Sequence, residues 1–127
     1  MTENEIASIV VDAAYKIHKM FGPGLLESAY AALLAYELTK RGLPVVMEQP
    51  IPHIYENVRI DMAYKADLMM DSPVILELKS VEKMAPVHYK QLLTYLKLAD
   101  KRLGLLINFG APLIKDGITR VVNGLPD

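Results

Sequence analysis

Cysteine is absent from the sequence, which excludes disulfide bonds, thiolate zinc sites and cysteine nucleophiles. Long apolar runs are absent too, because no stretch approaches the roughly 18 residues of a membrane-spanning helix. The first residues include Glu3, Glu5 and Asp12, where a signal peptide would carry basic and then purely apolar residues. We therefore expect a cytoplasmic protein that has no membrane partner.

Signatures of several other enzyme classes are also missing. The sequence has no Gly-rich phosphate loop, no dinucleotide fingerprint and no Ser/His/Asp arrangement. Its formal net charge is −1, so binding to nucleic acid would depend on a local basic patch or on a metal ion. The basic residues in or near the third predicted helix form either a surface for a phosphate backbone or a solvated helix face: Lys79, Lys83, Lys90, Lys97, Lys101 and Arg102.

The hydrophobic pattern predicts one α/β (α+β) domain over residues 1–127. Hydrophobic residues make up 52% of the 127 positions, enough for one core and also for an interface in a homo-oligomer or with a partner subunit. A Thr2-x-x-Glu5 capping box opens the first helical pattern, and Gly22-Pro23-Gly24 ends it. A second helical pattern begins near Leu26 and stops at Arg41-Gly42.

The remaining elements complete the order ααβββαββ, with helices flanking a mixed sheet. We predict strands at about residues 45–54, 58–70, 74–79, 103–108 and 117–122, and a third helix at about 86–99. Pro50 and Pro52 favour an edge position for the first strand. The apolar run of strand 74–79 favours a central position in the sheet.

Three charged residues stand out on two neighbouring strands: Asp67, Glu77 and Lys79. If residues 71–73 form a three-residue loop, antiparallel pairing sets Asp67 opposite Glu77. Lys79 then points to the same side of its strand as Glu77, because side chains alternate along a strand. A two-residue loop would shift the register by one residue and weaken this arrangement.

Two opposed carboxylates on a central strand repel each other, and burial increases that cost, so we expect a compensating positive charge. One solution is an ion pair of Lys79 with Asp67 or Glu77, which would be purely structural. The other is Mg²⁺ or Mn²⁺, because a hard cation binds carboxylate, water and phosphate oxygens. Lys79 would then orient or help to deprotonate the attacking water, or stabilise charge on the phosphate.

The second helix carries a further acidic candidate, Glu27, in its first turn. Its carboxylate would either complete the metal site or simply interact with the positive end of the helix dipole. Gly24 would permit a sharp turn before this helix, and Tyr30 would pack or offer its hydroxyl group.

The third helix carries Gln91 and Tyr95, one turn apart on the same face. They would either point to the metal site or to a phosphate group, or simply be a surface glutamine and a half-buried tyrosine. His88 shares that face, but a zinc site would need further ligands, and His18 and His53 do not have suitable spacing.

These residues together resemble a known family. Asp67 followed by Glu77-Leu78-Lys79 resembles the D…(D/E)-x-K core of the PD-(D/E)XK nuclease superfamily. The segment Gly24-x-x-Glu27-x-x-Tyr30 resembles the signature of its GxxExxY family. The resemblance spans about residues 5–124, with support from Lys65-Ala66-Asp67-Leu68, Pro86-Val87-His88, Gln91-Leu92-Leu93-x-Tyr95-Leu96 and Gly104-Leu105-Leu106-Ile107-Asn108-Phe109-Gly110. One departure is Ala66, which stands where this pattern often has proline before the aspartate.

The resemblance implies a restriction-endonuclease-like fold and a Mg²⁺- or Mn²⁺-dependent nuclease that cuts DNA, or else RNA, by attack of a metal-activated water. It implies that the metal is held by Glu27, Asp67, Glu77 and the carbonyl group of Leu78. It further implies a catalytic role for Lys79 beside Asp67 and Glu77, and for Gln91 and Tyr95 as in the Q-x-x-x-Y element of RecB-like nucleases. The alternatives are a non-catalytic nucleic-acid- or protein-binding module on the same fold and a subunit that works only with a partner.

Overall fold

The computed structural model describes residues 1–70 and 74–126. The helices are α1 (Glu3–Phe21), α2 (Glu27–Lys40), α3 (Pro86–Ala99) and the short 3₁₀ helix η1 (Ile114–Gly117). The strands are β1 (Val45–Tyr55), β2 (Val58–Met70), β3 (Val74–Lys79), β4 (Leu103–Asn108) and β5 (Ile118–Val122). The predicted order ααβββαββ is confirmed, and η1 is an addition that the hydrophobic pattern does not indicate. The turn expected at residues 71–73 lies outside the described residues.

The first helix begins as its sequence predicts. The Thr2 hydroxyl accepts a hydrogen bond from the Glu5 N–H (3.2 Å), and the Glu5 carboxylate accepts one from the Thr2 N–H (3.3 Å). The helix ends at Gly22, whose φ of 70° belongs to the left-handed region that glycine adopts without strain.

The five strands form one sheet in the order β1-β2-β3-β4-β5. Only β3 and β4 run parallel within this sheet of described strands, and α3 makes the long crossover that parallel neighbours require. The apolar strand β3 is central, and β1, which contains Pro50 and Pro52, lies at an edge. Both strand positions therefore agree with the prediction.

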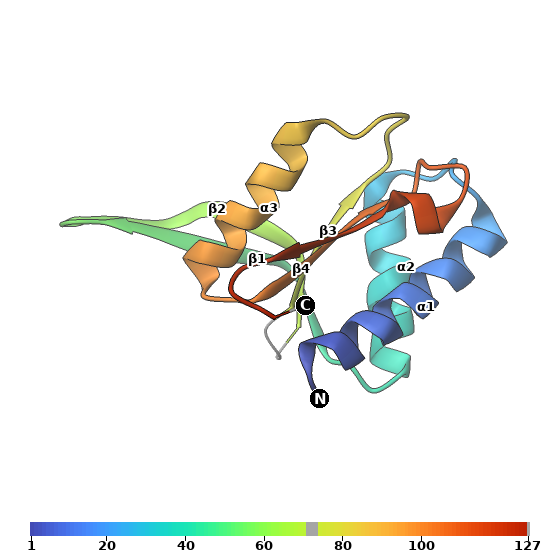
Figure 1. Cartoon of the computed structure of the whole chain (residues 1–127), viewed down its shortest axis with the longest axis horizontal. Coiled ribbons are helices and arrows are strands. Elements are labelled where there is room, and N and C mark those ends of the chain that lie inside the picture. Colours follow the sequence, from blue (N-terminus) through green and yellow to red (C-terminus); the bar gives the residue numbers. More distant parts are fainter. Residues whose placement is uncertain (71–73, 127) are drawn as a thin grey trace.

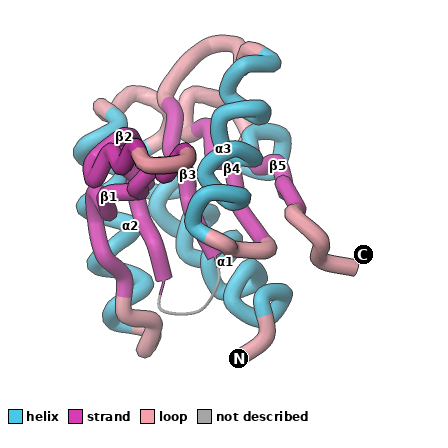
Figure 2. Tube along the Cα trace, turned by 90° about the vertical axis from the view of Figure 1, so that its left-hand side faces the viewer, coloured by secondary structure: helices cyan, strands magenta, loops and turns pink. Residues whose placement is uncertain are grey.

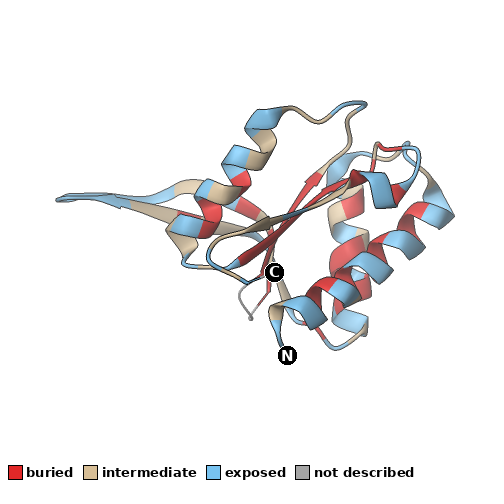
Figure 3. Ribbon diagram, in the orientation of Figure 1, coloured by how far each residue is buried: buried red, intermediate tan, exposed pale blue. Residues whose placement is uncertain are grey.

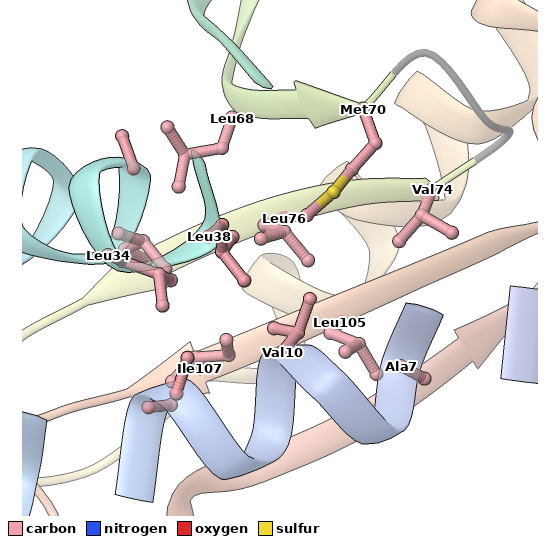
Figure 4. Packing of buried hydrophobic residues seen from close by; sticks show 14 of the residues in the cluster. Ala7, Val10, Leu34, Leu38, Leu68, Met70, Val74, Leu76, Leu105 and Ile107 are labelled. Atoms are coloured by element: carbon pink, nitrogen blue, oxygen red, sulfur yellow. The ribbon is translucent and has the colours of Figure 1, made fainter. Parts of the chain in front are cut away.

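Two clusters of buried side chains lie on opposite faces of the sheet. Leu76 of β3 packs in the cluster with α1 and α2, whereas Ile75, one residue earlier, packs with α3, because neighbouring side chains point to opposite faces. Figures 1 and 2 show α1 and α2 on one side of the sheet and α3 on the other. Figure 4 shows Val10, Leu34 and Leu38 of the helices meeting Leu76 over the sheet.

Strands β1 and β2 extend beyond the other strands as a two-stranded arm (Figure 1). Its outer part, mostly pale blue in Figure 3, is exposed. It carries exposed apolar residues: Ile54, Tyr55, Val58, Ile60 and Met62. At the inner end of the arm, β2 pairs with β3 at Leu68–Leu76 and Met69–Ile75. The arm therefore leaves the sheet at Asp67, the residue that the sequence places in the site.

No helix within residues 1–70 and 74–126 has both the length and the apolar character to cross a bilayer.

Candidate functional site

The register of β2 and β3 sets Asp67 opposite Glu77, as a three-residue connection predicts. Leu68 pairs with Leu76, and one further step along this register joins the two acids. The Asp67 carboxylate accepts a hydrogen bond from the Leu78 N–H (2.8 Å), and Glu77 Oε1 accepts a longer one from the Asp67 N–H (3.4 Å). Side chains thus replace the strand-to-strand hydrogen bonds where β2 and β3 separate.

The Glu77 carboxyl is buried, with only 7% of the residue surface exposed. Burial, the hydrogen bond to Asp67 and the charge of Asp67 together raise its pKa to about 9, and burial contributes most. The charge of Lys79 lowers the pKa of Glu77, but this is the smallest of the effects. At neutral pH, Glu77 therefore holds a proton, and full ionisation of the acid pair requires an additional positive charge nearby.

Lys79 ends β3 and is partly exposed. It lies two residues after Glu77 and therefore on the same face of the strand. None of the ion pairs among residues 1–70 and 74–126 includes Lys79. The purely structural interpretation, in which Lys79 pairs with Asp67 or Glu77, therefore has no support in this geometry. The ammonium group is available to a ligand.

A cavity of about 270 Å³ lies between α2 and Asp67 of β2. It is lined by Glu27, Ser28, Ala31, Met47, Glu48, Asp67 and Leu78. Glu27 and Asp67 therefore approach the same space from a helix and a strand, as the sequence predicts. Larger hollows of about 670, 480 and 470 Å³ lie along α1, but none of the predicted site residues lines them.

Glu48, which no motif indicates, lines this cavity as well. It lies in β1 between the pairs Met47–Leu68 and Gln49–Ala66, which places it opposite Asp67. Its φ of 51° is unusual for a residue other than glycine inside a strand. A single acid in an edge strand carries no signal of such a conformation, so only the three-dimensional structure reveals it.

Gln91 and Tyr95 come together on α3 as their spacing predicts. The Gln91 side-chain amide donates a hydrogen bond to the Tyr95 hydroxyl (3.0 Å). Tyr95 is buried, and burial raises its pKa most; the negative charges of Glu77 and Asp67 raise it further. The face of α3 that carries Tyr95 is therefore close enough to both acids for their charges to act on it.

His88, a lesser candidate, has a structural role. The His88 ring accepts a hydrogen bond at Nδ1 from the Ala85 N–H (3.2 Å) and so caps the start of α3. Gly24 was expected to permit a sharp turn, and its surroundings would also accept a residue with a Cβ. Its φ lies outside the left-handed region, and a Cβ there would have no atom within 4 Å. The glycine that adopts a positive φ is Gly22.

The described residues do not gather three acids or histidines in a geometry that would hold a metal ion by themselves. Asp67 and Glu77 are nevertheless in direct contact, and Glu27 lines the same cavity as Asp67. One or two carboxylates, completed by water and phosphate oxygens, are a common ligand set for Mg²⁺. The donor chemistry therefore fits a divalent ion. A role for the Leu78 carbonyl group stays a prediction.

The family model of the PD-(D/E)XK nuclease superfamily matches residues 4–121. The chain belongs to this superfamily. No curated protein and no solved structure is significantly similar to the chain. The five-stranded mixed sheet with helices on both faces is the restriction-endonuclease-like fold expected of a PD-(D/E)XK domain. Membership supports a nuclease-type function in general terms.

Proposed function

We propose that this PD-(D/E)XK domain hydrolyses phosphodiester bonds in nucleic acid, with DNA as the favoured substrate and Mg²⁺ or Mn²⁺ as cofactor. The observation that carries the proposal is the buried contact between Asp67 and Glu77. Burial first, and then Asp67, raise the pKa of Glu77 to about 9. A buried acid pair of this kind costs folding free energy unless a cation compensates its charge. Within the superfamily, Gly24, Glu27 and Tyr30 favour the GxxExxY family.

The metal would be held first by Asp67 and Glu77, with Glu27 across the cavity and the Leu78 carbonyl as further ligands. When bound, a divalent ion would polarise the attacking water and neutralise charge on the phosphate. The cavity of about 270 Å³ leaves room for water and phosphate oxygens to complete its coordination. The buried strand β3 on one side and helix α2 on the other would keep these ligands in place.

The remaining side chains act on the substrate. Lys79 has no ion-pair partner among the described residues, so its ammonium group would stabilise charge developing on the phosphate or orient the water. Tyr95 keeps its proton at neutral pH, because the ordinary pKa of tyrosine is about 10 and burial raises it further. Its hydroxyl accepts from Gln91, so its own hydrogen is directed to another acceptor, for which a phosphate oxygen is suited.

A second candidate function is a non-catalytic module on the same fold. The net charge of −1 favours it, as does the lack of a preassembled group of three metal ligands among the described residues. Calorimetry with Mg²⁺ and Mn²⁺, with and without DNA, separates the two functions. Absence of binding at millimolar metal in both cases would favour the module.

The direct test is a cleavage panel over single- and double-stranded DNA and RNA, with Mg²⁺, Mn²⁺ or EDTA. Lys79→Ala and Asp67→Ala should abolish cleavage while the variants stay folded by circular dichroism. Lys40→Ala, which changes an exposed lysine at the end of α2, is the matched control and should stay active. Activity that survives both site changes in a clean preparation would rule out the proposed site.

A further inference from the structure

A closed ring of contacts joins the start of α2 to the end of β3. The Ser80 hydroxyl donates a hydrogen bond to the Leu25 carbonyl (3.0 Å), and the Leu25 N–H donates one to the Tyr30 hydroxyl (3.0 Å). The Tyr30 ring stacks on the Phe109 ring, with centroids 4.2 Å apart and planes 11° from parallel. The Phe109 N–H donates to the carbonyl of Lys79 (2.8 Å), which precedes Ser80 in the chain and so closes the ring.

Tyr30 has the central place in this ring. Its side chain is fully buried, and its hydroxyl also donates a hydrogen bond to the Gly22 carbonyl. One hydroxyl group thus holds both Gly22 and Leu25 in the connection between α1 and α2, residues 22–26. Leu26, the N-cap of α2, makes no side-chain capping hydrogen bond, so these contacts to Tyr30 and Ser80 fix the start of the helix instead.

The ring lies between two segments of the site. Glu27 is the first residue of α2, only two residues after Leu25, and it lines the cavity with Asp67. Ser80 follows Lys79, the last residue of β3. The N–H of Leu25 is bound by Tyr30, and its carbonyl group is bound by Ser80. These two hydrogen bonds fix the main chain just before Glu27 relative to β3.

We propose that Tyr30 and Ser80 are positioning residues that hold Glu27 across the cavity from Asp67 by fixing the main chain of Leu25. The inference rests on the metal-binding role proposed above for Glu27. Neither positioning residue touches the metal or the substrate. Loss of either hydroxyl group lets the start of α2 move away from β3 and weakens the binding of the metal by the acids.

The first test needs no metal. Tyr30→Phe keeps the ring that stacks on Phe109 and removes only the hydroxyl, and Ser80→Ala removes the second contact to Leu25. Amide hydrogen exchange measured by NMR in EDTA should become faster at Leu25 in both variants, and should be unchanged at Val10 in the core of α1. Tyr36→Phe is the matched control, because Tyr36 lies on the same helix and is 67% exposed.

The second test measures Mn²⁺ affinity by calorimetry in the full chain. Tyr30→Phe and Ser80→Ala should each weaken binding, by about 10-fold for partners that orient a ligand. Glu27→Gln should weaken it as well. In the Glu27→Gln background neither Tyr30→Phe nor Ser80→Ala should weaken it further, because the positioned carboxylate is already missing.

The outcomes separate the two proposals. Unchanged exchange at Leu25 in both variants, or the same loss of Mn²⁺ affinity with and without Glu27, overturns the positioning role and leaves the metal site intact. A loss of the same size in Tyr36→Phe overturns it as well. Equal Mn²⁺ affinity of the unmodified chain and Glu27→Gln shows instead that Glu27 is no ligand, and removes the positioning role with it.

Discussion

Asp67 and Glu77 face each other where β2 separates from β3, and each carboxyl group is hydrogen-bonded to the main chain of the opposite strand. Asp67 accepts from the Leu78 N–H at 2.8 Å, and Glu77 accepts from the Asp67 N–H at 3.4 Å. The two acids are thus held by strands rather than by flexible loops, which is how a preorganised site is built. The raised pKa of Glu77 is the electrostatic cost of this arrangement without a cation.

Glu77 should make the metal-free protein less stable as the pH rises. Its pKa is about 9 in the folded state, against an ordinary value of about 4.5 for glutamate, so the folded chain keeps a proton that the unfolded chain releases. The contribution of Glu77 to the free energy of unfolding is fully present below about pH 4.5, the pKa of Glu77 in the unfolded chain. It is lost as the pH rises towards about 9, by at most ~1.4 kcal/mol per pH unit. Urea unfolding in EDTA across this range measures the slope.

Glu77→Gln separates this effect from every other titrating group. The amide keeps the shape of the side chain but has no proton to lose, so the variant should be more stable than the unmodified protein above neutral pH. Its stability should also depend less on pH. Glu27→Gln, which changes an exposed acid of the same site, should keep the original slope. Equal slopes for Glu77→Gln and the unmodified chain would contradict the assignment.

Metal binding should release protons at neutral pH. Glu77 is protonated there, and a carboxyl group must lose its proton to become a ligand, so about one proton should leave for each ion bound. Calorimetry in two buffers with different ionisation enthalpies counts the protons, and the apparent affinity should increase with pH until Glu77 is ionised. Glu77→Gln should bind weakly and release none. Tight binding without proton release would show that Glu77 is not a ligand.

Lys79→Met should abolish cleavage and leave the fold nearly as stable. The ammonium group is partly exposed and has no ion pair within the described residues, so its removal should change the free energy of unfolding by less than about 0.5 kcal/mol. The rate of cleavage should fall by about 100-fold or more if Lys79 acts on the water or the phosphate. A large loss of stability with little loss of rate would instead indicate a structural role.

Much of the fold follows from local rules that a sequence displays. The alternation of Ile75 and Leu76 predicts the two faces of β3, and the capping box at Thr2 predicts where α1 begins. The length of the 71–73 connection predicts the register, and with it the meeting of Asp67 and Glu77. These features depend on neighbouring residues, so they can be predicted without the rest of the chain.

The parts that could not be predicted depend on contacts between distant segments. The left-handed conformation of Glu48 has no sequence signal, because glutamate at this position is compatible with an ordinary strand. The bond from Ser80 to Leu25 joins residues 55 positions apart, and the stacking of Tyr30 on Phe109 also needs the assembled fold. The size of the pKa shift of Glu77 depends on burial that only the packed sheet supplies.

Tyr95→Phe should slow cleavage without weakening metal binding. The charges of Glu77 and Asp67 and, above all, burial raise the pKa of Tyr95, so its hydroxyl stays protonated and acts as a hydrogen-bond donor to the substrate. The Tyr64 ring, 5.4 Å away, still packs against phenylalanine, and loss of the Gln91 contact should cost about 1 kcal/mol of stability. Cleavage should fall by about 10-fold or more, while Mn²⁺ affinity measured by calorimetry stays the same. Tyr89→Phe on the same helix is the control, and an equal loss of rate there would show that altered packing of α3 causes the effect.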